Sequence, residues 1–140
     1  MLISTKGRYA LRVLIDLAEQ PQDAFIPLKE IATRQEISEK YLEAILRILV
    51  KGNVLIGVRG KGGGYRFVDS PEACDVGRVL SLTEESLAPV ACLDREVNLC
   101  ERQEDCRTLE LWSGLHDVIQ NYLSGVSIAD LVQSEAQGNV

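Results

Sequence analysis

Apolar residues in the first quarter of the chain recur every three or four positions, which is the spacing of one face of an α-helix. The first such run covers residues 4–20, with Ser4 as a good N-cap and Pro21 just beyond its end. A shorter run covers residues 28–35, and Pro27 stands near its first turn, where proline is tolerated. The pattern predicts two helices in succession.

A third helical run begins after Ser38, a residue type favoured at the N-cap, and Gly52 ends it. Its apolar positions fall on one face and comprise Tyr41, Leu42, Ile45, Leu46, Ile48 and Leu49. Its charged positions fall on the opposite face and comprise Lys40, Glu43, Arg47 and Lys51. With the short helix before it, this run predicts a helix-turn-helix whose second member is the recognition helix.

The spacing then changes, because residues 54–58 and 65–68 are short runs rich in β-branched and aromatic side chains and predict two strands. The loop between them is basic at Arg59 and Lys61 and too rich in glycine to form regular structure. A polar-striped helix beside a basic hairpin suits duplex DNA, since the helix can enter the major groove while the hairpin reaches phosphates. An ordinary helix–hairpin unit with a solvated charged face fits the same residues.

The polar residues of these segments provide eight candidates for DNA contact: Ser38, Lys40, Glu43, Arg47, Arg59, Lys61, Lys6 and Arg8. We expect Ser38, Lys40 and Glu43 at base edges, with Arg47 nearer a phosphate. The Glu43 carboxylate can accept a hydrogen bond from a cytosine amino group, and it repels phosphates, so it would penalise wrong sequences. Alternatively, Glu43 simply pairs with Arg47 one turn along the helix.

Charge is distributed unevenly between the two halves of the chain. Residues 1–66 contain 11 Lys/Arg and 7 Asp/Glu, a balance of +4, whereas residues 67–140 contain 4 and 14, a balance of −10. The net charge of −6 would argue against nucleic acid as a partner, but a basic half can face phosphates while the acidic half is held away. The acidic half is also rich in leucine, valine and isoleucine, so we expect it to fold.

The acidic half contains further helical patterns. We expect a helix over residues 74–87, a long helix over residues 105–124, and a short helix over residues 128–132 capped by Ser127. One apolar seam of the long helix comprises Leu109, Trp112, His116, Ile119, Leu123 and Val126. A second seam beside it comprises Leu111, Leu115, Val118 and Tyr122. Because one seam can pack on the protomer's own core, the other predicts a partner, most simply a second copy of the helix.

Three cysteines, Cys92, Cys100 and Cys106, lie before the long helix, with seven and five residues between them. This spacing matches neither the CxxC pairs of zinc sites nor ferredoxin runs. Thiolates are soft ligands, so zinc or an iron–sulfur cluster is one interpretation, and free or redox-active thiols are another. The acidic neighbours should raise the thiol pKa values, which disfavours a fast free-thiol switch. Cys74 stands apart, and we expect it to be a small buried residue.

No enzyme class is indicated. His116 and Asp117 are adjacent in a helix, where neighbouring side chains point apart, and the P-loop order GxxxxGK[ST] is absent. No stretch approaches 18 uninterrupted apolar residues, and the first apolar run is too short for a signal peptide. We therefore expect a cytoplasmic protein that is not an enzyme and has no membrane partner.

Two segments, STKGRYALRVLIDLA at residues 4–18 and RGKGGGYRF at residues 59–67, together resemble the IscR-type family of bacterial winged-helix transcription regulators. The resemblance covers residues 3–132. It implies a mainly α fold with a small β-hairpin wing, with a winged helix-turn-helix DNA-binding domain over residues 1–70. Residues 71–140 would form the cysteine loop, at 92–106, and the dimerisation helices. It also implies a homodimer that binds a palindromic operator in double-stranded DNA, mostly as a repressor.

In members of that family with three cysteines between wing and long helix, the cysteines ligate an iron–sulfur cluster, and Cys92, Cys100 and Cys106 match their positions. The familiar fourth ligands are not matched. Leu109 stands where IscR-type proteins have a histidine, and Arg8 stands where some nitric-oxide sensors supply an aspartate. The cluster type, 2Fe–2S or 4Fe–4S, stays open, and the site could be completed by His116, a carboxylate, Cys74, a small thiol or water.

The resemblance therefore implies a regulator that senses iron or iron–sulfur status, redox state or nitric oxide. The alternative is a cluster-free thiol- or zinc-dependent regulator, or an interaction module that signals through a protein partner.

Overall fold

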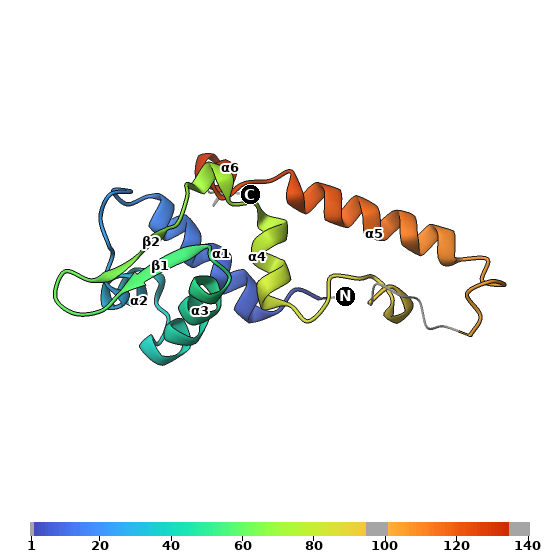
Figure 1. Ribbon diagram of the computed structural model, residues 1–140, viewed down its shortest axis with the longest axis horizontal. Coiled ribbons are helices and arrows are strands. Elements are labelled where there is room, and N and C mark those ends of the chain that lie inside the picture. The colour runs from blue at the N-terminus through green and yellow to red at the C-terminus, as the bar shows by residue number, and fades with distance from the viewer. Residues whose placement is uncertain (1, 95–100, 135–140) are drawn as a thin grey trace, which may run out of the picture.

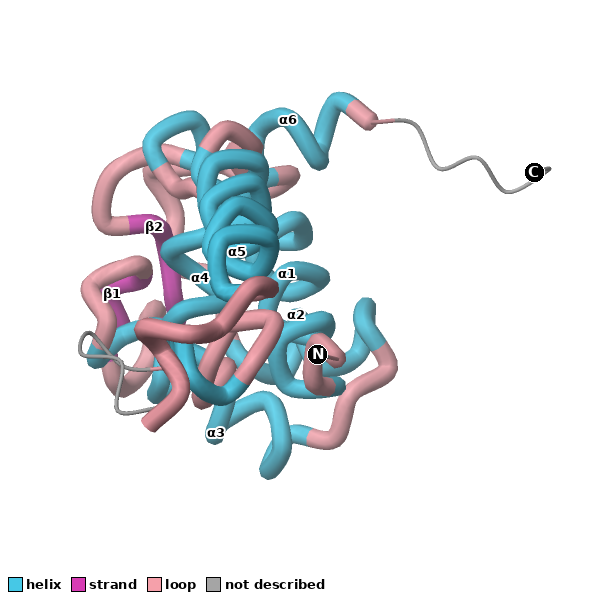
Figure 2. The backbone as a smooth tube through the Cα atoms, turned by 90° about the vertical axis from the view of Figure 1, so that its right-hand side faces the viewer, coloured by secondary structure: helices cyan, strands magenta, loops and turns pink. Residues whose placement is uncertain are grey.

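The structure is a computed structural model, and it describes residues 2–94 and 101–134. Its elements in chain order are α1 (Thr5–Ala18), α2 (Leu28–Gln35), α3 (Glu39–Lys51), β1 (Leu55–Val58), β2 (Gly64–Phe67), the 3-10 helix η1 (Pro71–Ala73), α4 (Val76–Thr83), the 3-10 helix η2 (Ala91–Leu93), α5 (Leu109–Ser124) and α6 (Ile128–Gln133). Helices α1 to α4, α6 and the hairpin form one body, and α5 leads away from it (Figure 1). Viewed nearly along its axis, α5 stands in front of that body (Figure 2).

Three serines begin helices, as the sequence predicts. The side chain of Ser4 accepts a hydrogen bond from the Gly7 amide at 3.0 Å, and Ser38 accepts one from the Tyr41 amide at 3.2 Å. Ser127 and Asp130 form a reciprocal capping box at the start of α6. These bonds satisfy amide groups that have no partner inside the helix.

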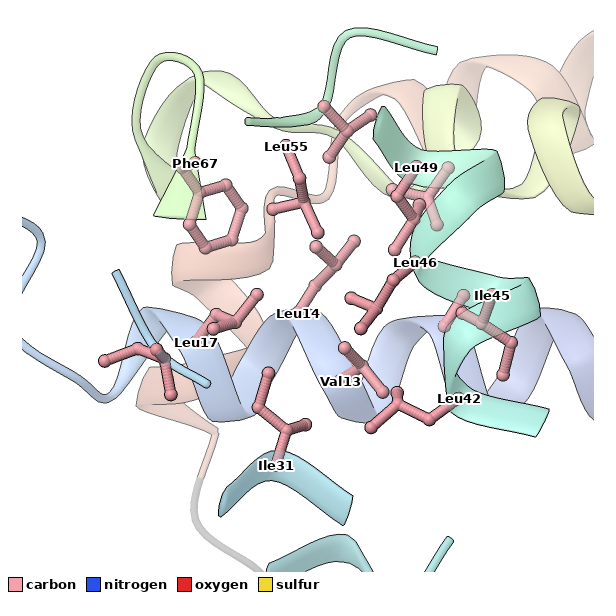
Figure 3. Close-up of a cluster of buried hydrophobic side chains, with 14 of the residues drawn as sticks. Val13, Leu14, Leu17, Ile31, Leu42, Ile45, Leu46, Leu49, Leu55 and Phe67 are labelled. Carbon is pink, nitrogen blue, oxygen red and sulfur yellow. The ribbon is translucent and has the colours of Figure 1, made fainter. Parts of the chain in front are cut away.

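The helix-turn-helix is held by one hydrophobic core (Figure 3). The apolar faces of α1 and α3 meet there, and α2 contributes Ile31. Between α2 and α3 the chain turns at Glu36, whose φ of 55° is left-handed. The most deeply buried side chains of this core include Leu14, Ile31, Leu42, Ile45, Leu46, Leu49 and Leu55.

The hairpin is antiparallel, with Leu55 opposite Phe67 and Val58 opposite Gly64. Its second strand also pairs with the α1–α2 loop, because Ile26 and Tyr65 exchange two backbone hydrogen bonds of 2.9 Å each. Gly64 is required at this junction: its φ is 142°, and a Cβ atom there would lie 2.3 Å from the Ile26 carbonyl oxygen. The hairpin is thus anchored where β2 begins, next to the loop of residues 59–63, and that loop projects outward (Figure 1).

The bounds of the fourth helix and of the long helix differ from the prediction. The fourth helix begins at Val76 rather than Cys74, because residues 71–73 form a 3-10 turn and the Asp75 carboxylate caps the Arg78 amide at 2.8 Å. It also ends at Thr83 rather than near residue 87. The long helix begins at Leu109 rather than 105, because a turn precedes it in which the Asp105 amide bonds the Arg102 carbonyl.

The core also takes in Cys74, Val79 and Ile128 from the second half of the chain. The division of the chain at residue 70 stays a prediction. Within residues 2–94 and 101–134, no helix is long and apolar enough to span a membrane.

Candidate DNA interface and cysteine loop

The recognition helix α3 presents its charged stripe to solvent. Leu42, Ile45, Leu46 and Leu49 are fully buried, whereas Lys40, Glu43 and Arg47 are exposed. The amphipathic spacing causes this, since residues three and four apart share a face. An Arg47 side-chain nitrogen lies 3.2 Å from a Glu43 carboxylate oxygen, and both side chains are mostly exposed. Such a pair is worth only about 0.3–0.5 kcal/mol, so either partner can be recruited by another ligand.

A groove of about 410 Å³ separates α3 from the wing. Glu43, Arg47 and Lys51 line it from α3, and Arg59 lines it from the wing. The structure therefore brings together three of the predicted contact residues: Glu43, Arg47 and Arg59. Three cations and one carboxylate give this groove a net positive charge, which suits a phosphate backbone.

Ser38 lines a different, open hollow of about 620 Å³, beside Lys29, Thr33 and Arg34. Lys29 and Thr33 were not predicted as contact residues. They lie on the exposed side of α2, and their approach to the start of α3 depends on the turn at Glu36. The helix-turn-helix pattern was the signal that could have pointed to them.

The other candidates lie outside both hollows. Lys40 and Lys61 are exposed, on α3 and at the wing tip respectively. Lys6 and Arg8 lie in the first turns of α1, where Arg8 donates to the Thr5 hydroxyl at 3.2 Å. The structure thus distributes the eight predicted residues over α1, α3 with its N-cap, and the wing.

A buried carboxylate joins α1 to α2. Asp16 is only 4% exposed, and it accepts hydrogen bonds from Arg34 at 2.8 and 3.0 Å and from the Gln35 side chain at 2.9 Å. Arg12, one turn earlier on α1, donates to the Gln35 carbonyl. These contacts fix the end of α2 just before the turn into the recognition helix.

The start of α1 is held by Glu84, the residue that follows α4. The Glu84 carboxylate accepts hydrogen bonds of 2.6 Å from both the amide and the hydroxyl of Ser4, and one of 3.0 Å from Thr83. Burial raises the pKa of Glu84, but these bonds and the nearby Lys6 outweigh that effect, so its pKa lies below the ordinary value. The linker to the cysteine loop is thereby tied to α1.

Two of the three predicted ligands lie in the described part of the chain. Cys92 and Cys106 are partly exposed and unpaired with other cysteines there, and Cys100 lies outside the described residues. Cys74 is 3% exposed and belongs to the core, where burial raises its pKa to about 11. The prediction that Cys74 is a small buried residue is confirmed.

The expectation that acidic neighbours raise the thiol pKa values is wrong for Cys106. A hydrogen bond between its thiol and the Thr108 hydroxyl, 3.5 Å apart, lowers its pKa, and the backbone amides of Thr108 and Leu109 act in the same direction. Local hydrogen bonds at the start of α5 outweigh the acidic surroundings. A thiol of lowered pKa is more readily a metal-binding thiolate.

His116 has a ring nitrogen, the buried Nδ1 atom, without a hydrogen-bond partner in the described part of the chain. It lines a hollow of about 340 Å³ together with Glu84, Leu93 and Asp94, and Leu93 directly follows Cys92. No three His, Cys, Asp or Glu side chains within residues 2–94 and 101–134 already gather as a metal site. The donor set nevertheless fits a soft metal centre, since it offers accessible thiols and an orphaned imidazole nitrogen.

The long helix leaves its second seam uncovered. Leu111, Leu115, Val118 and Tyr122 are 61%, 40%, 63% and 70% exposed respectively. The first seam, which includes Trp112, Ile119 and Leu123, is partly buried. Within this protomer, the second seam is therefore more exposed than the first, in agreement with the sequence pattern.

Comparison with known proteins places these features in a family. The model of the Rrf2 family, described as an iron-dependent transcriptional regulator, matches residues 3–134. The HTH-type transcriptional regulator IscR of Aliivibrio salmonicida is 38% identical over 138 residues, which is 98% of this chain and 81% of that protein. IscR of Yersinia enterocolitica is 36% identical over 135 residues, covering 96% and 81%.

Solved structures agree with the fold. CymR, the global cysteine regulator of B. subtilis, matches with a TM-score of 0.76 at 29% identity, over 97% of this chain and 99% of that chain. IscR of T. potens matches with a TM-score of 0.73 at 29% identity, over 99% and 95%. The predicted winged-helix fold is confirmed. The chain belongs to the Rrf2 family of transcriptional regulators.

Proposed function

We propose that this chain is a homodimeric DNA-binding regulator whose operator affinity depends on an iron–sulfur cluster held by Cys92, Cys100 and Cys106. The observation that carries the proposal is the position of Cys106 directly before α5. From Cys106 the chain enters α5 within three residues, and α5 bears the exposed apolar seam. An event at the loop is therefore close to the surface through which two copies would associate.

DNA contact would be made by α3 and the wing. An α-helix fits the major groove, where Ser38, Lys40 and Glu43 would meet base edges. Around it, five cations would contact phosphates and set the register: Arg47, Arg59, Lys61, Lys6 and Arg8. The exposure of these residues and the groove between α3 and the wing support this assignment.

Dimerisation would cover the seam of Leu111, Leu115, Val118 and Tyr122. A contiguous exposed apolar stripe on one helix is costly in water, and a second copy of the same helix would cover it symmetrically. A two-fold dimer would present two recognition helices to a palindromic operator, with half-sites about 34–36 Å apart or a multiple of that distance.

In the loop, the three thiolates would hold the cluster, which supplies a redox-active centre that can also be lost when iron is scarce. The hydrogen bond with the Thr108 hydroxyl, which lowers the pKa of Cys106, would favour the thiolate form of this ligand. Cys74 is unsuited as fourth ligand because it lies in the core. His116, a carboxylate, a small thiol or water would take that position. A change in operator affinity of about 5- to 150-fold would be typical of such coupling.

Anaerobic purification followed by a visible absorption spectrum and assays of iron, sulfide and zinc tests the cluster. A coloured protein with stoichiometric iron and sulfide is the expected result. A colourless protein without iron, even after anaerobic reconstitution, would contradict it.

One observation favours a second candidate, a cluster-free thiol- or zinc-dependent regulator. The lowered pKa of Cys106 would also serve a reactive thiol. In this case the purified protein would contain zinc or no metal, and operator binding would respond to thiol oxidants. The DNA-binding residues would be the same in both cases.

A further inference from the structure

Helix α4 contacts both the recognition helix and the long helix, although it has only eight residues. It lies between α3 and α5 in the fold (Figure 1). At about 1.5 Å per residue such a helix is only about 12 Å long, so it is a short and stiff connection.

At one contact, α4 binds the end of α3. The Arg78 guanidinium donates to the carbonyl oxygens of Gly52, at 3.1 Å, and Asn53, at 3.0 Å. Gly52 is the C-cap of α3 and Asn53 follows it, so a cation bound to their carbonyls complements the dipole at this end of the helix. Hydrogen bonds from a charged donor are also stronger than neutral ones.

Close packing reinforces this contact one turn further along α4. Gly52 lies directly against Leu82, and a Cβ atom at Gly52 would lie 2.4 Å from Leu82 Cδ1. A side chain at residue 52 would fit only if the Leu82 side chain moved. The position of α4 on the end of α3 is therefore fixed by contact as well as by hydrogen bonds.

In its first turn, next to Arg78, α4 is also joined to the point where α5 ends. The Val76 amide donates to the Val126 carbonyl, and the Ile128 amide donates to the Cys74 carbonyl, both at 2.8 Å. A Cβ atom at Gly77 would lie 3.3 Å from the Ser124 amide nitrogen. These contacts are between backbone atoms, so the position of α4 relative to the end of α5 is closely restricted.

We propose that Arg78 is a positioning residue that holds the recognition helix at a fixed distance from the long helix. This inference rests on the proposed function, because it is in the dimer that α5 determines the separation of the two recognition helices. Arg78 would then select the operators whose half-sites have the matching spacing. Its role is in the geometry of the dimer, since its guanidinium is engaged with the backbone of residues 52–53 and not directed at DNA.

The test uses the full-length protein and the operator that it selects from a random duplex pool, with versions lengthened or shortened by one central base pair. Arg78→Gln is compared with Arg66→Gln, a matched control that also removes an arginine-to-carbonyl hydrogen bond, from Arg66 to Asp23, away from the α3–α4 contact. We expect Arg78→Gln to reduce the discrimination between spacings by about fivefold or more. Arg66 lies in the wing, so Arg66→Gln can change the affinity at every spacing, but it should leave the ratio between spacings unchanged. Equal weakening at all three spacings by Arg78→Gln would overturn the inference.

A second readout needs no DNA. A spin label at the exposed position Ala44 of α3, on a protein with Cys92, Cys100 and Cys106 replaced by alanine, gives one distance between the two subunits. Arg78→Gln, or the milder Arg78→Lys if the first variant does not fold, should broaden that distance distribution. An unchanged, narrow distribution would overturn the role of Arg78. A missing inter-subunit distance in the parent protein would instead show that the proposed dimer fails.

Discussion

The side chains of Glu43 and Arg47 are available to DNA because the ion pair between them is exposed and weak. Their expected roles differ, since a carboxylate can only read a base edge whereas a guanidinium can neutralise a phosphate. The pair could be identified in the sequence from its spacing alone. Their position in one groove with Arg59 could not, because it depends on how the wing folds back beside α3.

Replacing either residue with alanine should separate these roles. Arg47→Ala should weaken binding to all sequences alike and reduce the salt dependence by about one phosphate contact. Glu43→Ala should instead cost little affinity and relax discrimination at one base pair, by about 1–3 kcal/mol. Titration of matched and mismatched duplexes at several salt concentrations measures both the salt dependence of binding and the discrimination between bases. A base-specific effect of Arg47→Ala, or a uniform loss with Glu43→Ala, would reverse the assignment.

The direction of the pKa shift of Cys106 could not be predicted from the sequence. The sequence predicts a raised pKa from nearby acidic residues, whereas a hydrogen bond with Thr108 and the amides of Thr108 and Leu109 lower it. Such bonds depend on where α5 begins, and that boundary was predicted four residues too early.

Thr108→Val should therefore raise the pKa of Cys106 in the metal-free protein. Because the thiolate is the reacting form, alkylation of Cys106 near pH 7.5 should become slower, and the midpoint of its rate against pH should move upward. Mass spectrometry of the labelled peptides measures this rate, and Cys92 in the same sample is the control. An unchanged midpoint at Cys106 would show that the Thr108 hydroxyl has no influence.

Among the elements, α1 and α3 could be predicted with their caps because the signals are local. The capping serines lie within three residues of the amides that they bind. The ion pair between Asp16 of α1 and Arg34 of α2 could not be predicted, because the two residues are 18 positions apart and meet only in the folded chain. In the sequence of α1, Asp16 is simply one charged residue among apolar ones, and nothing there identifies its partner.

Removing the charge of Asp16 tests the contribution of the Asp16–Arg34 ion pair to stability. Asp16→Asn should lower the free energy of unfolding by about 1.5–3 kcal/mol, the usual worth of a hydrogen bond to a charged group. Asp23→Asn, in the exposed loop after α1, is the matched control and should change it little. Urea unfolding followed by circular dichroism measures both variants. Equal stabilities for the two would show that the Asp16–Arg34 contact contributes little.

For the whole molecule, two seams on one helix indicate a surface beyond the protomer's own core. The structure leaves the seam of Leu111, Leu115, Val118 and Tyr122 exposed. The sequence could indicate that surface, because one apolar stripe of a helix packs on one neighbouring surface and a second stripe needs another. It could not show how α4 joins α5 to α3. The contacts between α4 and the end of α5 are between backbone groups, and Arg78 bonds to backbone carbonyls that lie 25 and 26 residues away in the sequence.

A charge in that seam should prevent association. Val118→Glu should produce a monomer, because burial of an unpaired carboxylate at the interface is costly. Asn121→Glu places the same charge on the exposed polar side of α5 and should leave the dimer intact. Sedimentation equilibrium gives the molecular mass of each variant. A dimeric Val118→Glu protein, or a monomeric parent, would show that this seam is not the interface.

In the proposed regulator, operator affinity depends on a cluster held by the three loop cysteines. The most direct measurement is an anaerobic titration of the selected operator with the cluster-loaded protein, with the same protein after iron removal, and with the Cys92/Cys100/Cys106→Ala variant. We expect the last two to bind alike and to differ from the loaded protein by about 5- to 150-fold. Three equal affinities, with the cluster verified in the loaded sample, would contradict the account.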